Sequence, residues 1–257
     1  NNNPANPVIN VRAWGEDPKT ASALAVAFQR GLKQAGVLGC AKHFPGHGDT
    51  TSDSHLELPI LPHSRERLEQ IELPPFQAAI AAGVDSVMTA HLVLPKLDPQ
   101  QPATLSKAVL TNLLRRQMRF NGLVVTDALV MEAISARHGA AEAAVLAFEA
   151  GADLILMPAD ADAAIDGLCD GFSSGRLCLG RLDGSLQHRA NALASIPTSK
   201  ASGPIVSADE QALEAELVRH SITVGEAKVL PQAGINLVRV DALVPVSYTH
   251  LRAHETK

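Results

Sequence analysis

Three histidines, two aspartates and a lysine lie close together in the segment KHFPGHGDTTSDSH, residues 42–55. Side chains of these types transfer protons and bind polar ligands, and histidine does both near neutral pH. The segment follows an apolar run at 37–41 and continues, rich in Gly, Ser, Thr and Asp, to about Ser64. Loops of this length are uncommon in compact domains and are usually functional or disordered. We therefore expect this segment to form the reactive edge of an enzyme.

Asp53 and His55 form the first candidate pair within the segment. A carboxylate two residues from an imidazole can hold the ring in one tautomer and stabilise its cation, which gives a proton donor and acceptor. An Asp-x-His sequence also occurs in solvated turns, and that reading stays open. A metal site that uses these two residues with His43, His47 and Asp49 is the other alternative. The spacing matches no standard zinc arrangement and contains no HExxH motif, so we expect no metal.

Polar residues also follow three apolar segments of the chain. Lys42 and His43 follow the first segment, and His91 and Asp127 end the next two. A carboxylate at the end of a buried strand can be a nucleophile, a metal ligand or a helix N-cap, and Asp is a favoured cap. Lys42 and His43 can bind the hydroxyl groups of a polar ligand. The alternative is a lysine that reaches solvent beside a histidine of the core.

Apolar segments typical of strands alternate with segments typical of helices. The chain predicts strands at 37–44, 85–91, 122–127 and 152–158, and helices near 17–34, 64–82, 106–119, 140–150, 160–170, 180–196 and 208–220. Within the second helix we expect a break at Pro74-Pro75. Apolar strands that alternate with helices indicate a parallel sheet covered by helices.

Two architectures fit this alternation, an open doubly wound sheet and a (β/α)8 barrel. In both, ligands meet the carboxyl ends of the strands, and the polar residues that end three of the segments lie there. A closed barrel needs eight strands, whereas only about four are clear. The absence of a GxGxxG or Walker-type glycine loop disfavours a nucleotide-binding sheet.

The composition excludes several classes of partner. The 257 residues are 46% hydrophobic and 3% aromatic and carry a net charge of −5. Without a basic stripe, nucleic acid is not expected as the main partner. No run of about 18 apolar residues predicts a transmembrane helix. The three cysteines follow no disulfide spacing, which fits a reducing compartment, and we expect Cys40 in the core.

The motifs together resemble a known family. Residues 42–48, KHFPGHG, with the DSH triplet at 53–55, resemble glycoside hydrolase family 3 in its β-N-acetylglucosaminidase (β-hexosaminidase) branch. Residues 125–131, VTDALVM, resemble the nucleophile motif of that family, and residues 10–18, NVRAWGEDP, resemble its sugar-binding loop. The motifs occur in the family's order over residues 1 to about 245, which makes the resemblance specific.

The resemblance implies an α/β fold, a (β/α)8 TIM-type barrel that is incomplete here and is followed by the start of an αβα second domain. It implies a retaining hydrolase that removes terminal β-linked N-acetylglucosamine from peptidoglycan or chitin-type fragments. By the motif match, Asp127 would be the nucleophile that forms the glycosyl-enzyme. His55 would be the general acid/base, with Asp53 as its partner.

The same match gives the substrate-binding residues. Arg12, Lys42 and His43 match sugar-binding positions, and His91 is a further candidate for the pocket. The resemblance implies a small carbohydrate substrate, with no cofactor, metal, nucleic acid or membrane as a partner. The DSH triplet favours an N-acetylhexosamine, because β-glucosidase-like members lack it. A histidine acid loses its proton as the pH rises, so we expect activity to be greatest near or below neutrality.

Three alternatives stay open. The histidine arrangement could let phosphate attack instead of water, which would make the protein an N-acetylglucosaminide phosphorylase. The protein could instead be a β-glucosidase of the same family. It could also be a catalytically inactive sugar-binding fragment, since the first strands of the family's barrel are expected to be missing and the chain starts without Met.

The expected domain organisation follows from the same resemblance. Residues 1–196 would form a partial barrel, 197–228 a linker region, and 229–245 the start of the second domain. Residues 246–257 resemble the translation of a sequencing adapter, and we expect them to be a non-native tail without a role in function. The cytoplasm is the favoured compartment, with a secreted or periplasmic location as the alternative.

Overall fold

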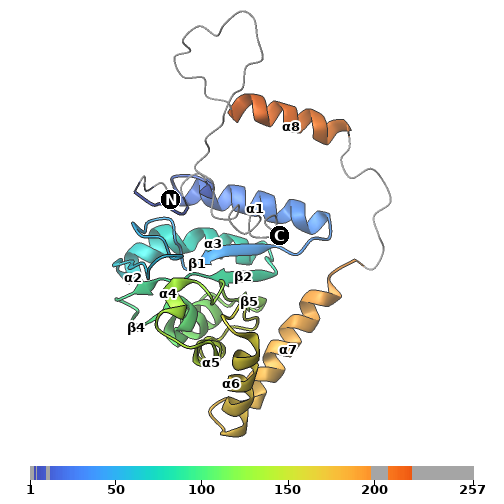
Figure 1. Ribbon diagram of the computed structural model, residues 1–257. Helices are drawn as coiled ribbons and strands as arrows, with labels where there is room; N and C mark the ends of the chain where they lie inside the picture. Colours follow the sequence, from blue (N-terminus) through green and yellow to red (C-terminus); the bar gives the residue numbers. More distant parts are fainter. Residues whose placement is uncertain (1–2, 4, 10–11, 198–207, 222–257) are drawn as a thin grey trace, which may run out of the picture. The chain divides into compact units, whose positions relative to one another are not determined.

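The computed structural model describes residues 3, 5–9, 12–197 and 208–221 (Figure 1). The chain divides into two compact units, Asn1–Ile196 and Pro197–Lys257. In the second unit the described part is helix α8 (Ala208–Ser221), as predicted. The predicted start of the second domain and the predicted tail lie outside the described residues. In the first unit, residues 10 and 11 of the predicted sugar-binding loop do so as well.

A parallel sheet lies at the centre of the first unit (Figure 1). Its order is β1 (Cys40–Phe44), β2 (Ser86–Thr89) and β5 (Leu123–Val125), which are three of the predicted strands. The predicted strand at 152–158 is reduced to one parallel bridge between Leu154 and Val125. This open parallel sheet with helices confirms the predicted α/β class, and its strand order β1-β2-β5 fits part of a (β/α)8 barrel.

The segment between β2 and η4 contains a hairpin that the sequence did not predict. β3 (Val93–Leu94) and β4 (Asp98–Pro102) pair antiparallel, and Ile60 forms a parallel bridge with Val93. The hairpin contains three prolines, Pro95, Pro99 and Pro102. Prolines are typical of loops, which is why we predicted no strand there. It brings the end of the loop that follows β1 against the segment that follows β2.

Local signals explain where the helices begin and end. In α1 (Pro18–Gln34) the Asp17 side chain accepts a hydrogen bond from the Thr20 amide at 2.9 Å, and Pro18 takes the first position, where no N–H partner is needed. Gly151 ends α5 with a φ of 129°, which residues with a side chain rarely adopt. The other helices of the first unit are η3 (Ala103–Leu105), η4 (Ala108–Gln117), α4 (Glu132–Ser135), α5 (Ala140–Ala150), α6 (Ala161–Ser173) and α7 (Leu179–Ala194).

The predicted break at Pro74-Pro75 is wrong. Helical structure runs without interruption from α2 (Arg65–Arg67) through the π-helical turn η2 (Leu68–Glu72) into α3 (Leu73–Ala81). Both prolines fall in the first turn of α3, next to the wide π turn. Proline is tolerated in a first turn because its missing N–H has no helical partner there.

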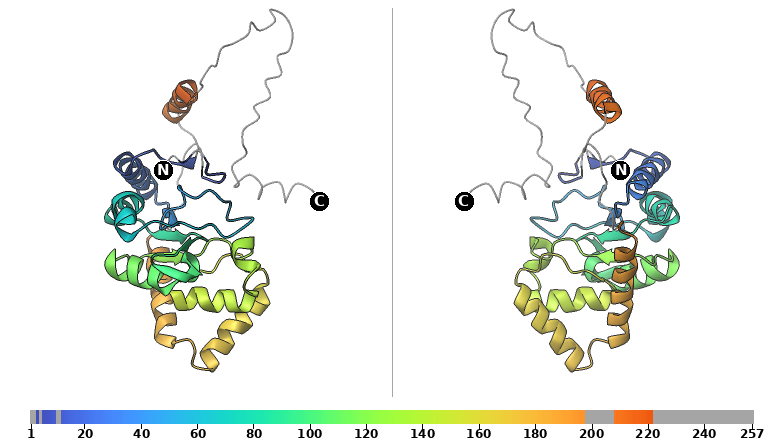
Figure 2. Two further views of the ribbon diagram at one scale, coloured as in Figure 1. Left: turned by 90° about the vertical axis from the view of Figure 1, so that its left-hand side faces the viewer. Right: turned by 90° about the vertical axis from the view of Figure 1, so that its right-hand side faces the viewer.

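Helices pack against the sheet in neighbouring pairs. α1 lies beside α3, and α5 lies beside α6 (Figure 2). The core between sheet and helices is built from Leu, Val and Ala with a few phenylalanines, among them Phe44 and Phe120. Cys40 was predicted in this core but is exposed, because β1 is an edge strand of the described sheet. Among the described residues, no helix combines the length and apolar character that a membrane span requires.

A fully buried carboxylate fastens α7 to the sheet. The Asp153 side chain accepts hydrogen bonds from Arg115, from Arg181 at 3.1 Å, from the Ser185 hydroxyl at 2.7 Å and from the Val124 amide at 2.9 Å. Two guanidinium groups therefore share one buried anion. Removing that anion would leave them without a counter-charge.

We predict that Asp153→Asn lowers the free energy of unfolding by about 3–5 kcal/mol, because it leaves partly buried arginines unpaired. Urea unfolding followed by circular dichroism measures this loss. Arg176→Ala is the matched control, since its ion pairs with Glu142 and Glu149 are exposed and should contribute no more than about 1 kcal/mol. Equal losses in the two variants would contradict the prediction.

Candidate active site

Asp127 follows β5 and lies at the carboxyl end of the sheet. Its Oδ1 accepts a hydrogen bond from the Ala128 amide at 2.9 Å, and its own amide donates to Thr89 Oγ1 at 3.3 Å. Oδ2 lies 3.7 Å from Nε2 of His43 and makes no shorter contact with the described residues. The N-cap alternative is wrong, because α4 begins only at Glu132. A partly exposed carboxylate with one free oxygen can act as a nucleophile.

His43 stands next to this carboxylate on β1. Burial lowers the pKa of His43 to about 3, although the nearby Asp127 charge acts in the opposite direction. The positive charges of Lys42 and Arg12 act in the same direction as burial and contribute to this lowered pKa. His43 is therefore neutral at ordinary pH, and it can exchange hydrogen bonds with a polar ligand without neutralising Asp127.

Two more buried histidines, His47 and His91, lie close enough to Asp127 to interact with its charge. Burial lowers the pKa of both His47 and His91, and the Asp127 charge opposes this shift in each. Nε2 of His91 donates to the Ala128 carbonyl at 2.9 Å, and its Nδ1 lies 2.8 Å from Thr104 Oγ1. His91 thus supports the backbone next to Asp127. A direct contact between His91 and a sugar stays a prediction.

Asp53 and His55 are in contact on the loop after β1. The His55 Nδ1 lies 2.7 Å from Asp53 Oδ1, which also accepts a hydrogen bond from the His55 amide at 2.9 Å. The carboxylate therefore holds Nδ1 as a donor, and the other ring nitrogen, Nε2, has no partner among the described residues. Both side chains are partly exposed, so Nε2 is available to a ligand.

Arg12, Lys42 and His43 are among the residues that line a cavity of about 360 Å³. The cavity continues between α1 and α3, where its walls include Phe28 and Phe76. In the described part of the chain the Lys42 ammonium group has no hydrogen-bond or ion-pair partner. The structure thus brings the three predicted sugar-binding residues together and links them to Asp127 through His43. Asp53, His55 and Asp127 do not line this cavity.

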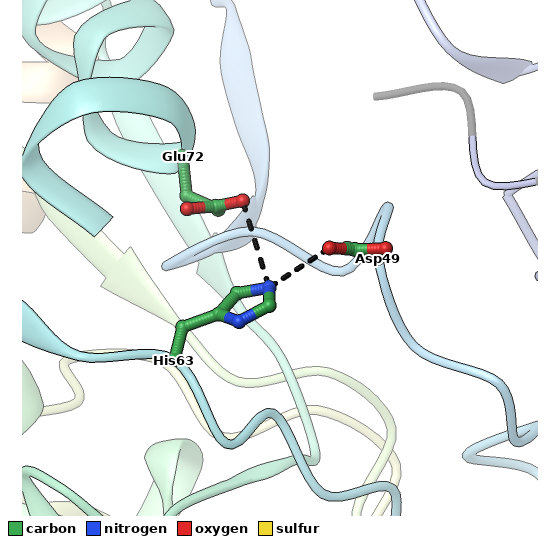
Figure 3. Close-up of side chains that lie close together, drawn as sticks. All are labelled: Asp49, His63 and Glu72. Atoms are coloured by element: carbon green, nitrogen blue, oxygen red, sulfur yellow. Dashed lines mark hydrogen bonds and ion pairs between the residues drawn. The ribbon is translucent and has the colours of Figure 1, made fainter. Parts of the chain in front are cut away.

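A second cluster, missed in the sequence, lies where the loop meets the helices. Asp49, His63 and Glu72 place three potential ligand atoms within 4.8 Å of one another (Figure 3). Nε2 of His63 lies 2.9 Å from Asp49 Oδ2 and 4.0 Å from Glu72 Oε1. The Arg67 guanidinium reaches the same two oxygens, at 3.3 Å and 3.1 Å. The Arg67 guanidinium therefore pairs with the same two carboxylate oxygens that a metal ion would bind.

This cluster ties the two ends of the loop together. Asp49 lies near the start of the loop and His63 near its end, with Asp53 and His55 between them. Burial raises the pKa of Glu72, and the Arg67 charge opposes the rise. Sequence spacing gave no signal for this cluster, because its members meet only after the loop has folded back onto η2.

Comparisons with known proteins agree with these motifs. A family model described as "Glycosyl hydrolase family 3 N terminal domain" matches residues 1–192. The chain is 37% identical to Beta-hexosaminidase A of Pseudoalteromonas piscicida, in an alignment that covers 87% of this chain and 42% of that protein. Its structure resembles a glycoside hydrolase family 3 β-N-acetylglucosaminidase from Paenibacillus sp. str. FPU-7, with a TM-score of 0.81, 43% identity, and coverage of 90% of this chain and 46% of that one.

Another similar structure carries a different activity in its name. It is a β-glucoside phosphorylase, BglX, with a TM-score of 0.73, 31% identity, and coverage of 82% of this chain and 40% of that one. The chain spans about half the length of the relatives it matches. The family model nevertheless covers most of this chain, and the predicted resemblance is confirmed. The chain belongs to glycoside hydrolase family 3.

Proposed function

We propose that this chain supplies the catalytic residues of a retaining β-N-acetylglucosaminidase, which removes terminal β-linked N-acetylglucosamine from peptidoglycan or chitin-type fragments. The observation that carries the proposal is the 2.7 Å contact between Asp53 and His55, which leaves the second ring nitrogen available for proton transfer. The names of the relatives support the substrate class, since they include β-hexosaminidases and a β-N-acetylglucosaminidase.

In the first step, Asp127 attacks the anomeric carbon of the sugar. Oδ1 is held by the Ala128 amide, so Oδ2 is the oxygen that forms the new bond. The bond between the anomeric carbon and the leaving oxygen breaks, and protonated His55 gives the proton on Nε2 to that oxygen. The products of this step are the free leaving group and a glycosyl-enzyme on Asp127.

In the second step, water replaces Asp127 at the anomeric carbon. Neutral His55 takes a proton from the water at Nε2, the water oxygen bonds to the anomeric carbon, and the bond to Oδ2 breaks. Two displacements at one carbon retain its configuration. A histidine in place of a second carboxylate avoids another negative charge near Asp127.

Arg12, Lys42 and His43 are proposed to hold the sugar hydroxyl groups. The unpaired Lys42 ammonium group and the neutral His43 ring are both free to form hydrogen bonds with a ligand. Arg12 and Lys42 line the same cavity as His43, and neither forms an ion pair with Asp127 in the described part of the chain. They would attract the polar substrate without forming an ion pair with the nucleophile.

Phosphate is the alternative attacking group in the second step. The similarity to a β-glucoside phosphorylase favours this second candidate, and a histidine repels a phosphate anion less than a carboxylate would. The two reactions give different products from one chromogenic N-acetylglucosaminide, the free sugar with water and the sugar 1-phosphate with phosphate. Chromatography of the products with and without added phosphate separates them.

The same substrate tests for an inactive sugar-binding protein. Release of the chromophore supports an enzyme, and its absence in a chain that unfolds cooperatively supports a binding protein. Circular dichroism during thermal unfolding identifies a chain that does not fold. A chromogenic glucoside run in parallel identifies a β-glucosidase, which would cleave it faster than the N-acetylglucosaminide.

We predict that Asp127→Asn lowers kcat/KM for the chromogenic substrate by at least about 10³-fold, because an amide cannot form the glycosyl-enzyme. Asp162→Asn is the matched control, since Asp162 is exposed on α6 and lies outside the site. Azide added to Asp127→Ala should restore turnover and give a glycosyl azide of inverted configuration. A variant at position 127 as active as the parent protein would end the nucleophile assignment.

We predict that the protein loses stability as the pH falls below about 6.5. Unfolded histidines take up protons near pH 6.5, whereas buried His43 does not until about pH 3, and His47 and His91 also have lowered pKa values. The unfolded state therefore binds more protons in this window. Between these two pH values His43 should lower the free energy of unfolding by about 1.4 kcal/mol per pH unit, and His47 and His91 should act in the same direction.

Urea unfolding at several pH values between 7.5 and 4.5 measures this slope. Replacing His43 by Gln removes one titrating group. It should lower the slope of unfolding free energy against pH by about 1.4 kcal/mol per pH unit, which corresponds to one proton. A free energy of unfolding that does not change over this range would contradict the assignment of these histidines as neutral. Activity should then decline on the acid side together with the folded fraction.

A further inference from the structure

His47 is a buried histidine for which the proposed reaction has no direct use. It is 4% exposed and lies in the loop after β1, between the sugar-binding residues and the acid/base pair. Both ring nitrogens are engaged by the loop itself. Nδ1 lies 2.8 Å from Thr50 Oγ1, and Nε2 lies 3.1 Å from Ser54 Oγ. The ring therefore lies between the side chains of Thr50 and Ser54 and connects them by hydrogen bonds.

The hydrogen bonds around Thr50 determine which nitrogen of His47 carries the proton. Thr50 Oγ1 donates its hydrogen to the His47 carbonyl at 3.1 Å, so it can only accept from Nδ1. Nδ1 is then the donor, and the neutral ring accepts at Nε2. The Ser54 hydroxyl must donate to Nε2, which gives this contact a fixed direction.

Ser54 is the residue between the two members of the proposed acid/base pair. It is 2% exposed, and it is the only buried residue from Thr51 to Glu57, where every residue is described. Its hydroxyl has His47 as its side-chain partner in the described part of the chain. Asp53 and His55 are partly exposed on either side of it. The backbone that carries the pair is therefore anchored on its buried side by the hydrogen bond between the Ser54 hydroxyl and His47.

The same histidine is connected to the segment that carries Arg12. Asn6 donates from Nδ2 to the His47 carbonyl at 2.8 Å and to Thr50 Oγ1 at 3.3 Å. Asn6 Oδ1 accepts from the amides of Val8 and Ile9 at 2.9 Å and 2.7 Å. A continuous series of hydrogen bonds thus runs from the N-terminal segment through His47 to Ser54.

We infer that His47 is a positioning residue, which fixes the Asp53–His55 pair through Ser54 and keeps it in register with the N-terminal segment that carries Arg12. The inference rests on the proposed function, because the group that it positions is the proposed acid/base. His47 does not touch the substrate in this arrangement. It acts on the reaction through the distance between the His55 ring and the leaving oxygen, to which proton transfer is sensitive.

The sharpest test compares two variants of Ser54 that have nearly the same shape and differ in one hydroxyl group. Ser54→Thr keeps the hydroxyl and Ser54→Val replaces it by a methyl group of similar size. We expect the Val variant to have a kcat about 10-fold to 100-fold below that of the Thr variant, with KM within about threefold. Thr51→Ala is the control, because Thr51 is exposed in the same loop and has no hydrogen-bond partner in the described chain. Equal kcat values in the Thr and Val variants would overturn the inference.

The histidine itself is tested with two amides. The amide of His47→Gln reaches the position of Nε2 and can still accept from Ser54, whereas the amide of His47→Asn reaches only the position of Nδ1. We expect the Gln variant to retain about 10-fold more kcat than the Asn variant, although both remove the imidazole. The reverse order, or equal activity, would refute the role of the Ser54 contact.

A readout without catalysis separates this inference from the proposed function. Hydrogen–deuterium exchange measured by mass spectrometry reports the mobility of residues 51–57 in the unliganded protein. Ser54→Val should speed exchange there about 10-fold relative to Ser54→Thr, and exchange in β2 and β5 should not change. Unchanged exchange in the loop refutes the positioning role even in an active enzyme. Faster exchange in a protein without glycosidase activity supports the positioning role and refutes the proposed function.

Discussion

The parallel pairing of β1, β2 and β5 is the constraint on which the site depends. Parallel strands end at the same edge of the sheet, so polar residues that follow them gather there although they are far apart in sequence. His43 and Asp127 are 84 residues apart, and their side chains lie 3.7 Å from each other for this reason.

Removal of water from three imidazole rings sets the electrostatics of this edge. Burial favours the neutral forms of His43, His47 and His91, so the three imidazoles whose electrostatics couple to the Asp127 carboxylate are not cations. Among the described residues, the ionisable group in contact with this carboxylate is the neutral His43 ring, at 3.7 Å. The charge stays available for reaction, and the cost of burying it is reduced by its partial exposure.

Local patterns predicted the elements better than the contacts between them. Asp17-Pro18 predicted the start of α1. The two-residue spacing of Asp53 and His55 predicted their contact, because side chains this close in sequence can meet without help from the rest of the fold. The uninterrupted helix through Pro74-Pro75 was missed, because a π turn before the prolines cannot be read from the sequence. The contacts of Ser54 and His63 were also missed, since they depend on how the whole loop folds.

The closure between Asp49 and His63 has a consequence for protein engineering. It anchors the ends of the loop independently of the exposed tip that follows His55, where Leu56 is 74% exposed. The tip can therefore be exchanged as a cassette, because its side chains carry little of the core packing. A library confined to Leu56 and Glu57 would vary the surface next to the proposed proton donor while the scaffold stays intact.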